Sequence, residues 1–316
     1  MARPDVGTVA MKRAALGLAC AAALATGGAA QQQFFRSGVD LVHFGVTVVD
    51  RRGQLVTGLG PEDFAVHEGR TRQQIRYFAS GDDTDSAPPL HLGLLFDTSG
   101  SMGEDMQFAR TAAIRFLNEV TRAVDITLVD FDTEVRVARY GQADFPRLVE
   151  RIRMREPDGW TALYDAVGVY LHGAGDQDGQ KILVVYTDGG DTRSSMSFGD
   201  CVSLLRMSDV TLYAIGFLSH QSTSVRASQQ LYLRQMASAT GGEAYFPLSK
   251  DHLDEIYGKI LEEMAARYDI GYVSNDTRTD GAWRDVEIRL VRSDLKGAKI
   301  RTRPGYYGPY KDTPGG

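Results

Sequence analysis

The chain has 316 residues, of which 43% are hydrophobic and 24% charged, and its formal net charge is −6. This is a globular composition, with enough length for one large core or for two domains. A mildly acidic chain lacks the basic surface that binds nucleic acid, so we expect no nucleic-acid partner.

The first 30 residues have the layout of a secretory signal peptide. A basic start at residues 11–13 precedes a short apolar stretch and then small residues, and the stretch is too short for a membrane span. We expect cleavage after Ala30 and export to the periplasm or beyond the cell. Cys20 is a poor candidate for lipid attachment, because Gly17 stands where a bulky aliphatic residue is expected. No later segment has the length and apolar character of a transmembrane segment.

Export does not imply a disulfide in this chain. Without residues 1–30 the protein has 32 basic and 40 acidic side chains, a net charge of −8, and a single cysteine, Cys201. An intramolecular disulfide is therefore impossible. Cys201 shares helical spacing with Phe198 and Leu205, which predicts a buried thiol on the apolar face of a helix rather than a reactive one.

The N-terminal part of the mature chain has the pattern of β-strands. Residues 31–80 contain alternating apolar residues and a tight turn at residues 67–70, which together predict three or more strands. The stretch 81–88 is polar, contains proline and shows no periodicity. It therefore predicts a linker between two domains.

Residues 89–268 alternate between predicted strands and helices. The strands are near-continuous apolar runs at 90–96, 125–131, 181–187, 210–217 and 243–246. The helical patterns lie at 104–124, 143–154, 161–174, 199–208, 228–239 and 251–268. This alternation predicts an α/β fold, a Rossmann-like doubly wound and mostly parallel sheet with helices on both faces. Residues 134–140 follow a strand directly and predict an antiparallel hairpin strand at the sheet edge.

The C-terminal segment, residues 269–316, again has the pattern of β-strands. Neither this segment nor residues 31–80 has enough strands to bury a core alone. We therefore expect the two segments to pair into a β-sandwich-like flanking domain, with the α/β domain inserted between them.

Side chains that carry oxygen follow the ends of the predicted strands. Ligands of open α/β sheets bind at the carboxyl ends of the strands. The candidates there are Asp97, Ser99 and Ser101 after the first strand, Thr161 at the start of a helix, and Asp188 after the strand 181–187. Carboxylates and hydroxyls are the ligands that Mg²⁺ prefers, and alternation directs every second side chain of an extended turn to one point, with Gly100 allowing a bend.

Each candidate also has a simpler structural interpretation. Ser99 or Ser101 can cap a helix, Thr161 can cap the helix that follows it, and Asp188 can belong to a polar turn. Asp191 is interpreted as a solvated loop acid or as a partner behind the ligands. Asp130 and Asp132 are interpreted as loop or hairpin acids.

The sequence "DTSGSM" at 97–102 resembles the D-x-S-x-S signature of the von Willebrand factor type A domain, which also occurs in integrin I domains. "DGWTALYDA" resembles the threonine loop of that family and "YTDGGD" its aspartate loop. The resemblance implies a metal-ion-dependent adhesion site formed by Asp97, Ser99, Ser101, Thr161 and Asp188. The chain also resembles secreted bacterial proteins that carry this domain between β-rich flanks. Trp160 departs from the family, which usually has a small residue there, and its ring either shapes the rim of the site or packs.

The resemblance implies a secreted, non-enzymatic binding or adhesion protein that uses Mg²⁺ or Mn²⁺. A protein partner would supply an acidic residue to the open coordination position of the metal. One alternative is a Mg²⁺-dependent hydrolase or phosphotransferase with Asp97 as nucleophile. Such enzymes want a second acid two residues later, where Ser99 stands, together with a positioned charge stabiliser. The other alternative is a structural scaffold with a vestigial metal site.

Overall fold

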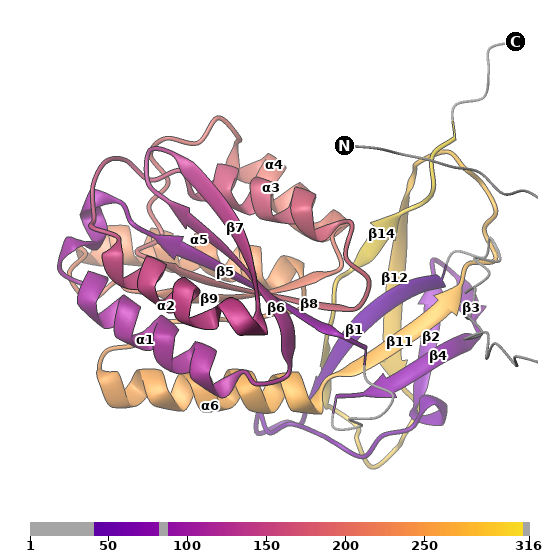
Figure 1. Ribbon diagram of the computed structural model, residues 1–316. Helices are drawn as coiled ribbons and strands as arrows, with labels where there is room; N and C mark the ends of the chain where they lie inside the picture. The colour runs from indigo at the N-terminus through magenta and orange to yellow at the C-terminus, as the bar shows by residue number, and fades with distance from the viewer. Residues whose placement is uncertain (1–40, 82–87, 312–316) are drawn as a thin grey trace, which may run out of the picture. The chain divides into compact units, whose positions relative to one another are not determined.

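The computed structural model describes residues 41–81 and 88–311. The predicted signal peptide (residues 1–30), the first residues of the N-terminal β-rich segment and most of the predicted linker lie outside the described residues. The described chain forms an α/β domain and two antiparallel β-sheets (Figure 1). None of its helices in these ranges combines the length and apolarity needed to cross a membrane.

The central sheet of the α/β domain confirms the predicted doubly wound fold. Its strands are β5 (Leu90–Asp97), β6 (Ala123–Phe131), β7 (Val135–Gly141), β8 (Gln180–Thr187), β9 (Val210–Gly216) and β10 (Ala244–Tyr245). They lie in the order β10-β9-β8-β5-β6-β7. Every pair is parallel except β6 with β7. The antiparallel edge strand expected at residues 134–140 is therefore present.

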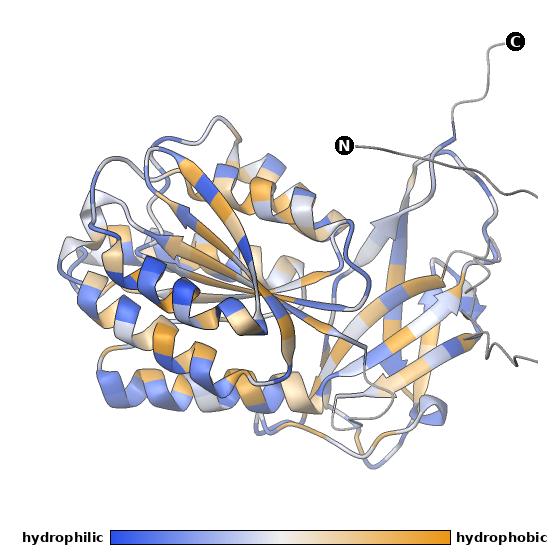
Figure 2. Ribbon diagram, viewed as in Figure 1, coloured by the Kyte–Doolittle hydropathy of each residue, from blue (hydrophilic) through white to orange (hydrophobic). Residues whose placement is uncertain are grey.

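Helices cover both faces of this sheet. They are α1 (Met106–Glu119), α2 (Phe145–Met154), α3 (Leu163–Ala174), α4 (Phe198–Met207), α5 (Thr223–Ala239) and α6 (Lys250–Ala266). Buried residues of α1, α2 and α6 form one apolar cluster with the strands, and those of α3, α4 and α5 form a second. The strands between the two clusters are correspondingly apolar along their length (Figure 2), as expected for a sheet buried on both faces.

Two local predictions within this domain have different outcomes. Cys201 is fully buried in the second cluster, and burial raises the pKa of its thiol to about 12, which confirms the buried, unreactive thiol. The helix predicted at 104–124 is too long, because α1 ends at Glu119 and β6 begins at Ala123. Val120 and Ala123 belong to the same buried cluster as the helix. The apolar spacing therefore continues past the end of the helix and does not show where it ends.

The flanking sheets each combine strands from both ends of the described chain. The N-terminal strands are β1 (Leu41–Val49), β2 (Phe64–Glu68), β3 (Thr71–Gln73) and β4 (Ile75–Ser80). The C-terminal strands are β11 (Tyr268–Val273), β12 (Trp283–Leu290), β13 (Lys299–Arg301) and β14 (Gly305–Tyr307). One sheet has the order β13-β1-β11-β4 and the other β14-β12-β2-β3. Neither sheet is complete without strands from both segments.

A shared apolar core joins the two flanking sheets. Side chains from both, among them Phe44, Val66, Tyr268, Tyr272 and Ile288, form one buried cluster. Buried and exposed residues alternate along β12, so only one face of this strand turns to the shared core. The two segments therefore depend on each other for a core.

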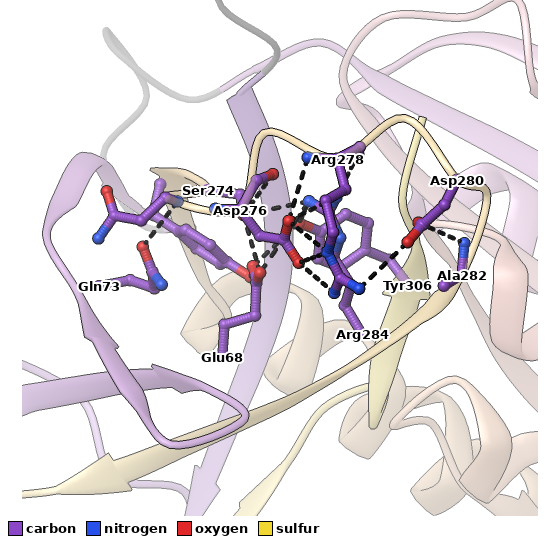
Figure 3. Close-up of polar contacts among 11 residues, drawn as sticks. Glu68, Gln73, Ser274, Asp276, Arg278, Asp280, Ala282, Arg284 and Tyr306 are labelled. Atoms are coloured by element: carbon purple, nitrogen blue, oxygen red, sulfur yellow. Dashed lines mark hydrogen bonds and ion pairs between the residues drawn. The ribbon is translucent and has the colours of Figure 1, made fainter. Parts of the chain in front are cut away.

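A buried polar cluster also ties the sheets together (Figure 3). Glu68 of β2 accepts hydrogen bonds from the hydroxyls of Tyr272 and Tyr306 at 2.8 and 2.9 Å, and from Ser274 at 2.8 Å. Arg284 of β12 lies 4.0 Å from the Glu68 carboxylate and donates to Ser274 and Tyr306 at 3.1 and 3.2 Å. Because Glu68 and Arg284 are each at most 9% exposed, loss of one charge leaves the other poorly compensated.

We expect Glu68→Ala to lower the free energy of unfolding of the flanking sheets by about 3 kcal/mol. The matched control is Glu287→Ala on the neighbouring strand, whose exposed ion pair with Arg289 is screened by solvent, so its loss should cost far less. Urea unfolding followed by the emission of Trp283 in β12, in a Trp160→Phe background, measures both. Equal losses for the two variants would contradict a structural role of the buried cluster.

Candidate metal centre

The candidate site lies at the point in the central sheet where the strand order reverses. The chain runs from β5 to β6 and β7 on one side, and β8 then pairs with β5 on the other side. A crevice forms at such a point outside the carboxyl ends of the strands. Asp97 is the last residue of β5, and Asp188 follows Thr187 at the end of β8. The sheet topology thus brings the two predicted carboxylates to one edge.

Asp97 is fully buried, and both of its carboxylate oxygens accept hydrogen bonds. The backbone N–H of Ser99 donates to one oxygen at 2.9 Å, and the hydroxyl of Thr187 donates to the other at 2.6 Å. Thr187 also accepts a hydrogen bond from the N–H of Gly189 at 3.0 Å. Thr187 was not among the predicted ligands, and its position one residue before Asp188 was the only signal for this role. These contacts fix the orientation of the Asp97 side chain.

Burial, and after it the negative charge of Asp188, raise the pKa of Asp97 to about 7. The hydrogen bonds from Ser99 and Thr187 act the opposite way and lower it. A buried carboxylate beside a second negative charge is costly to ionise unless a positive charge compensates it. A divalent cation would supply that charge.

Ser99 and Ser101 lie in the loop that follows β5, called the first loop below, and their side chains turn toward each other. Their hydroxyl oxygens lie 3.1 Å apart, so the oxygens of Asp97, Ser99 and Ser101 form one chain of contacts. Ser99 occupies the N-cap position of the 3₁₀ helix Gly100–Gly103 but makes no capping hydrogen bond with its side chain. Thr98, between Asp97 and Ser99, faces elsewhere, since its hydroxyl donates to the carbonyl of Phe131 at 3.0 Å. The side chain of Ser99 is therefore not used to cap this helix.

Gly100 has a different role from the bend expected for it. It is not among the glycines with positive φ, so the backbone there does not require glycine for its conformation. Its N–H donates to the carbonyl of Gly159 at 3.1 Å, and the N–H of Asp158 donates to the carbonyl of Thr98 at 2.9 Å. These two hydrogen bonds join the first loop to the threonine loop.

Thr161 is 3% exposed. It is held by the aspartate loop, which follows β8, carries Asp188 and is called the third loop below. Its N–H donates to the Thr192 hydroxyl at 3.0 Å, and its carbonyl accepts from the N–H groups of Thr192 and Arg193. The start of α3 does not use Thr161 as its cap. The N–H of Tyr164 donates instead to Asp191, and the N–H of the next residue donates to Ser194. The hydroxyl of Thr161 is therefore not committed to capping α3.

Asp191 is a helix-capping residue rather than a solvated loop acid. Besides Tyr164, it accepts hydrogen bonds from the N–H and the hydroxyl of Ser194 at 3.1 and 2.6 Å. In the reverse direction Asp165 in the first turn of α3 accepts from the N–H groups of Ser195 and Met196 at 2.9 and 3.0 Å. This reciprocal capping fixes the third loop, which carries Asp188, against the threonine loop.

Asp188 itself is 3% exposed. The N–H of Gly190 and the side-chain amide of Gln221 each donate to its carboxylate at 3.4 Å. These long contacts hold it more loosely than Asp97 is held. The structure thus gathers both carboxylates and the two serine hydroxyls at one edge of the sheet, with Thr161 on the adjoining loop.

The donor set suits a hard divalent cation. In the described ranges no group of three or more His, Cys, Asp and Glu side chains is arranged to hold a metal, so any site here must use hydroxyls beside the two carboxylates. Mg²⁺ fits that requirement, because it takes oxygen ligands, uses one or two carboxylates and keeps water in its shell.

Asp130 lies in a strand of the β6-β7 hairpin, opposite Arg136, rather than in the hairpin loop. It lies within β6, its side chain is 1% exposed, and it forms ion pairs with Arg136, Arg151 and Arg155. The alternation of "VDFDTEV" did not indicate this, because the arginines come from β7, α2 and the end of α2. Asp132 does lie in the hairpin, where Arg136 pairs with it at 2.7 Å. This cluster braces the end of β6 beside the candidate site.

The chain matches the model of the von Willebrand factor type A domain over residues 91–259, and it therefore belongs to that family. A relative, the uncharacterized protein sll0103 of Synechocystis sp., is 25% identical over 164 residues, which cover 48% of this chain and 38% of that protein. The match thus spans well under half of that relative's length.

Solved structures with similarity to this chain include two bacterial proteins. The von Willebrand factor type A protein from Catenulispora acidiphila has a TM-score of 0.48 and 13% identity, covering 88% of this chain and 76% of that one. The pilus adhesin SpaC from Lactobacillus rhamnosus GG has a TM-score of 0.48 and 9% identity, covering 80% and 49%.

We expect Asp97→Asn to stabilise the metal-free protein as pH rises. The folded pKa of Asp97, about 7, lies above its unfolded value, so its contribution to stability is complete at low pH and is lost as pH rises through 7. The variant should therefore gain about 2 kcal/mol relative to wild type between pH 5.5 and 8.5. Urea unfolding in the presence of chelator measures the difference, and a pH-independent difference would contradict the raised pKa.

Proposed function

We propose that this protein is an exported, non-enzymatic binding or adhesion protein that binds its partner through a metal ion. Asp97, Ser99, Ser101, Thr161 and Asp188 would hold Mg²⁺ or Mn²⁺ at the carboxyl edge of the central sheet. The partner would be a protein that supplies an acidic side chain.

The observation that carries this proposal is the pair of buried carboxylates. Asp97 is fully buried, and the negative charge of Asp188 raises its pKa in the same direction as burial does, so ionising Asp97 is costly unless a cation compensates it. The facing hydroxyls of Ser99 and Ser101 add neutral oxygen donors at the same point. Two ionised carboxylates balance the two positive charges of a bound Mg²⁺, and the hydroxyls add neutral oxygen ligands.

Each of the proposed ligand residues would have a distinct role in holding the metal. Asp97, fixed by Ser99 and Thr187, would orient the serine loop. Asp188 and Thr161 would complete the oxygen set from the two loops joined by reciprocal capping. A bound divalent cation supplies Lewis acidity toward an incoming carboxylate. Because the set has fewer protein oxygens than the six that Mg²⁺ takes, positions remain for water or for a partner's carboxylate.

The alternative functions receive less support. A nucleophilic Asp97 would need an accessible oxygen, whereas its side chain is fully buried and both oxygens accept hydrogen bonds. A vestigial scaffold would not need the hydroxyls of two serines to face each other beside a carboxylate. Metal-dependent binding is therefore the function that this geometry supports best.

Isothermal titration with Mg²⁺ tests the site. We expect Asp97→Ala to abolish detectable binding to an otherwise stable domain, because it removes a carboxylate ligand. The matched control is Asp176→Ala, which removes an exposed acid near the other end of α3 and should leave the affinity within about twofold of wild type.

Equal Mg²⁺ binding by wild type and Asp97→Ala would refute the metal assignment. The absence of heat with wild type, at metal concentrations of several millimolar, would do the same. The partner is tested by retention of envelope proteins on the immobilised chain, with Mg²⁺ and with chelator. Retention that chelator does not alter would contradict a role for the metal in binding.

A further inference from the structure

Trp160 is a large apolar side chain exposed beside the candidate metal site. It directly precedes Thr161 in the chain, and it is 64% exposed. The ring therefore does not pack into the core, which decides between the two roles that the sequence left open. A solvent-exposed tryptophan is unfavourable in isolation, and buried tryptophans are among the residues that contribute most to protein interfaces.

The backbone that carries Trp160 is fixed by hydrogen bonds to the neighbouring loops. The N–H of Trp160 donates to the hydroxyl of Thr133 at 2.9 Å, and the carbonyl of Gly159 accepts from Gly100 at 3.1 Å. Gly159 has φ of +73°, and a Cβ there would lie 2.4 Å from the Thr133 hydroxyl. Only glycine fits this position, so the residue before Trp160 is constrained by the same contact that positions the tryptophan.

This fixation has an energetic consequence for binding. A side chain on a preordered backbone loses little conformational freedom when a partner covers it. Tryptophan adds a large contact area with few rotatable bonds. Trp160 therefore has the properties of an anchor for a partner, and it stands one residue from a proposed metal ligand.

The rim around this position is acidic. The carboxylates of Glu104, Glu134 and Glu156 are 75%, 77% and 82% exposed, and Asp158 is exposed beside Gly159. The arginines that pair with Glu134 and Glu156 are only 29% and 20% exposed. In each of these ion pairs the acid is the more exposed partner, and these acids would repel a partner segment that carries several acids.

We propose that Trp160 is a specificity-determining residue for the partner, an inference that rests on the proposed metal-dependent function. The partner segment presents one carboxylate to the metal, an apolar or aromatic residue next to that carboxylate for Trp160 to cover, and neutral or basic residues beyond. The metal selects the acid, the indole selects its neighbour, and the acidic rim rejects polyacidic segments.

The test uses short peptides of defined sequence as probes. Gly-Gly-Asp-Gly-Gly is compared with Gly-Phe-Asp-Gly-Gly and Gly-Gly-Asp-Phe-Gly, each in Mg²⁺ and in chelator, by competition against a fluorescent Phe-containing peptide. Versions with lysine or glutamate at both ends test the rim. The proteins are wild type, Trp160→Ala and the control Leu231→Ala, which removes a 53% exposed leucine from the middle of α5.

We expect wild type to prefer one of the Phe peptides over the Gly peptide by about tenfold in Mg²⁺. Trp160→Ala should lose this preference, while it keeps wild-type Mg²⁺ affinity by calorimetry and the preference for lysine over glutamate ends. Leu231→Ala should behave as wild type.

An unchanged Phe preference in Trp160→Ala would overturn the inference, and so would the absence of any such preference in a wild type that binds Mg²⁺. Failure of wild type to bind Mg²⁺ is a different result, because it refutes the metal site itself. The calorimetric measurement thus separates the two failures.

Position of the indole relative to the metal is checked without a peptide. Of the two tryptophans in the chain, we expect Mn²⁺ to broaden the indole N–H resonance of Trp160, and Asp97→Ala to abolish the broadening. Assignment comes from Trp160→Phe. An indole resonance of Trp160 that is insensitive to Mn²⁺, in a protein shown by calorimetry to bind it, would place the ring away from the metal and contradict the proposal.

Discussion

A buried carboxylate beside a second carboxylate is the constraint around which the top of the α/β domain is built. Asp97 ends the central strand with no exposed surface, and Asp188 opposes its ionisation. Removing such an anion from water is costly unless hydrogen bonds and an opposite charge compensate it. Thr187 and the N–H of Ser99 supply the hydrogen bonds. Under the proposed function, a divalent cation bound beside the nearby hydroxyls supplies the opposite charge.

The loops that carry these groups are joined to one another by hydrogen bonds. Asp191 and Ser194 of the third loop cap α3, and Asp165 of α3 holds the third loop in return. Gly100 joins the first loop to Gly159. Each hydrogen bond is worth only about 1 kcal/mol, but together they hold three segments, far apart in sequence, in one arrangement. The same bonds give Trp160 its fixed backbone.

The flanking sheets follow from a different constraint, the amount of apolar surface that a short segment can bury. Strand β1 pairs with β11 and β2 pairs with β12, so each sheet needs strands from before and after the α/β domain. The shared core and the Glu68 cluster then make the two ends of the described chain one structural unit. Insertion of a domain between such segments is tolerated because loop closure costs rise slowly with length.

The sequence by itself determined the alternation of strands and helices, and hence the doubly wound fold, because near-continuous apolar runs and helical spacing are local patterns. It also placed oxygen-bearing side chains at strand ends and identified Cys201 as buried. Only the tertiary structure decided which groups satisfy one another. Asp130 lies in a strand among three arginines, Asp191 caps a distant helix, and Trp160 faces solvent. The contacts of Asp130 with Arg151 and of Asp191 with Tyr164 join residues more than twenty positions apart, and no local pattern of the sequence encodes them.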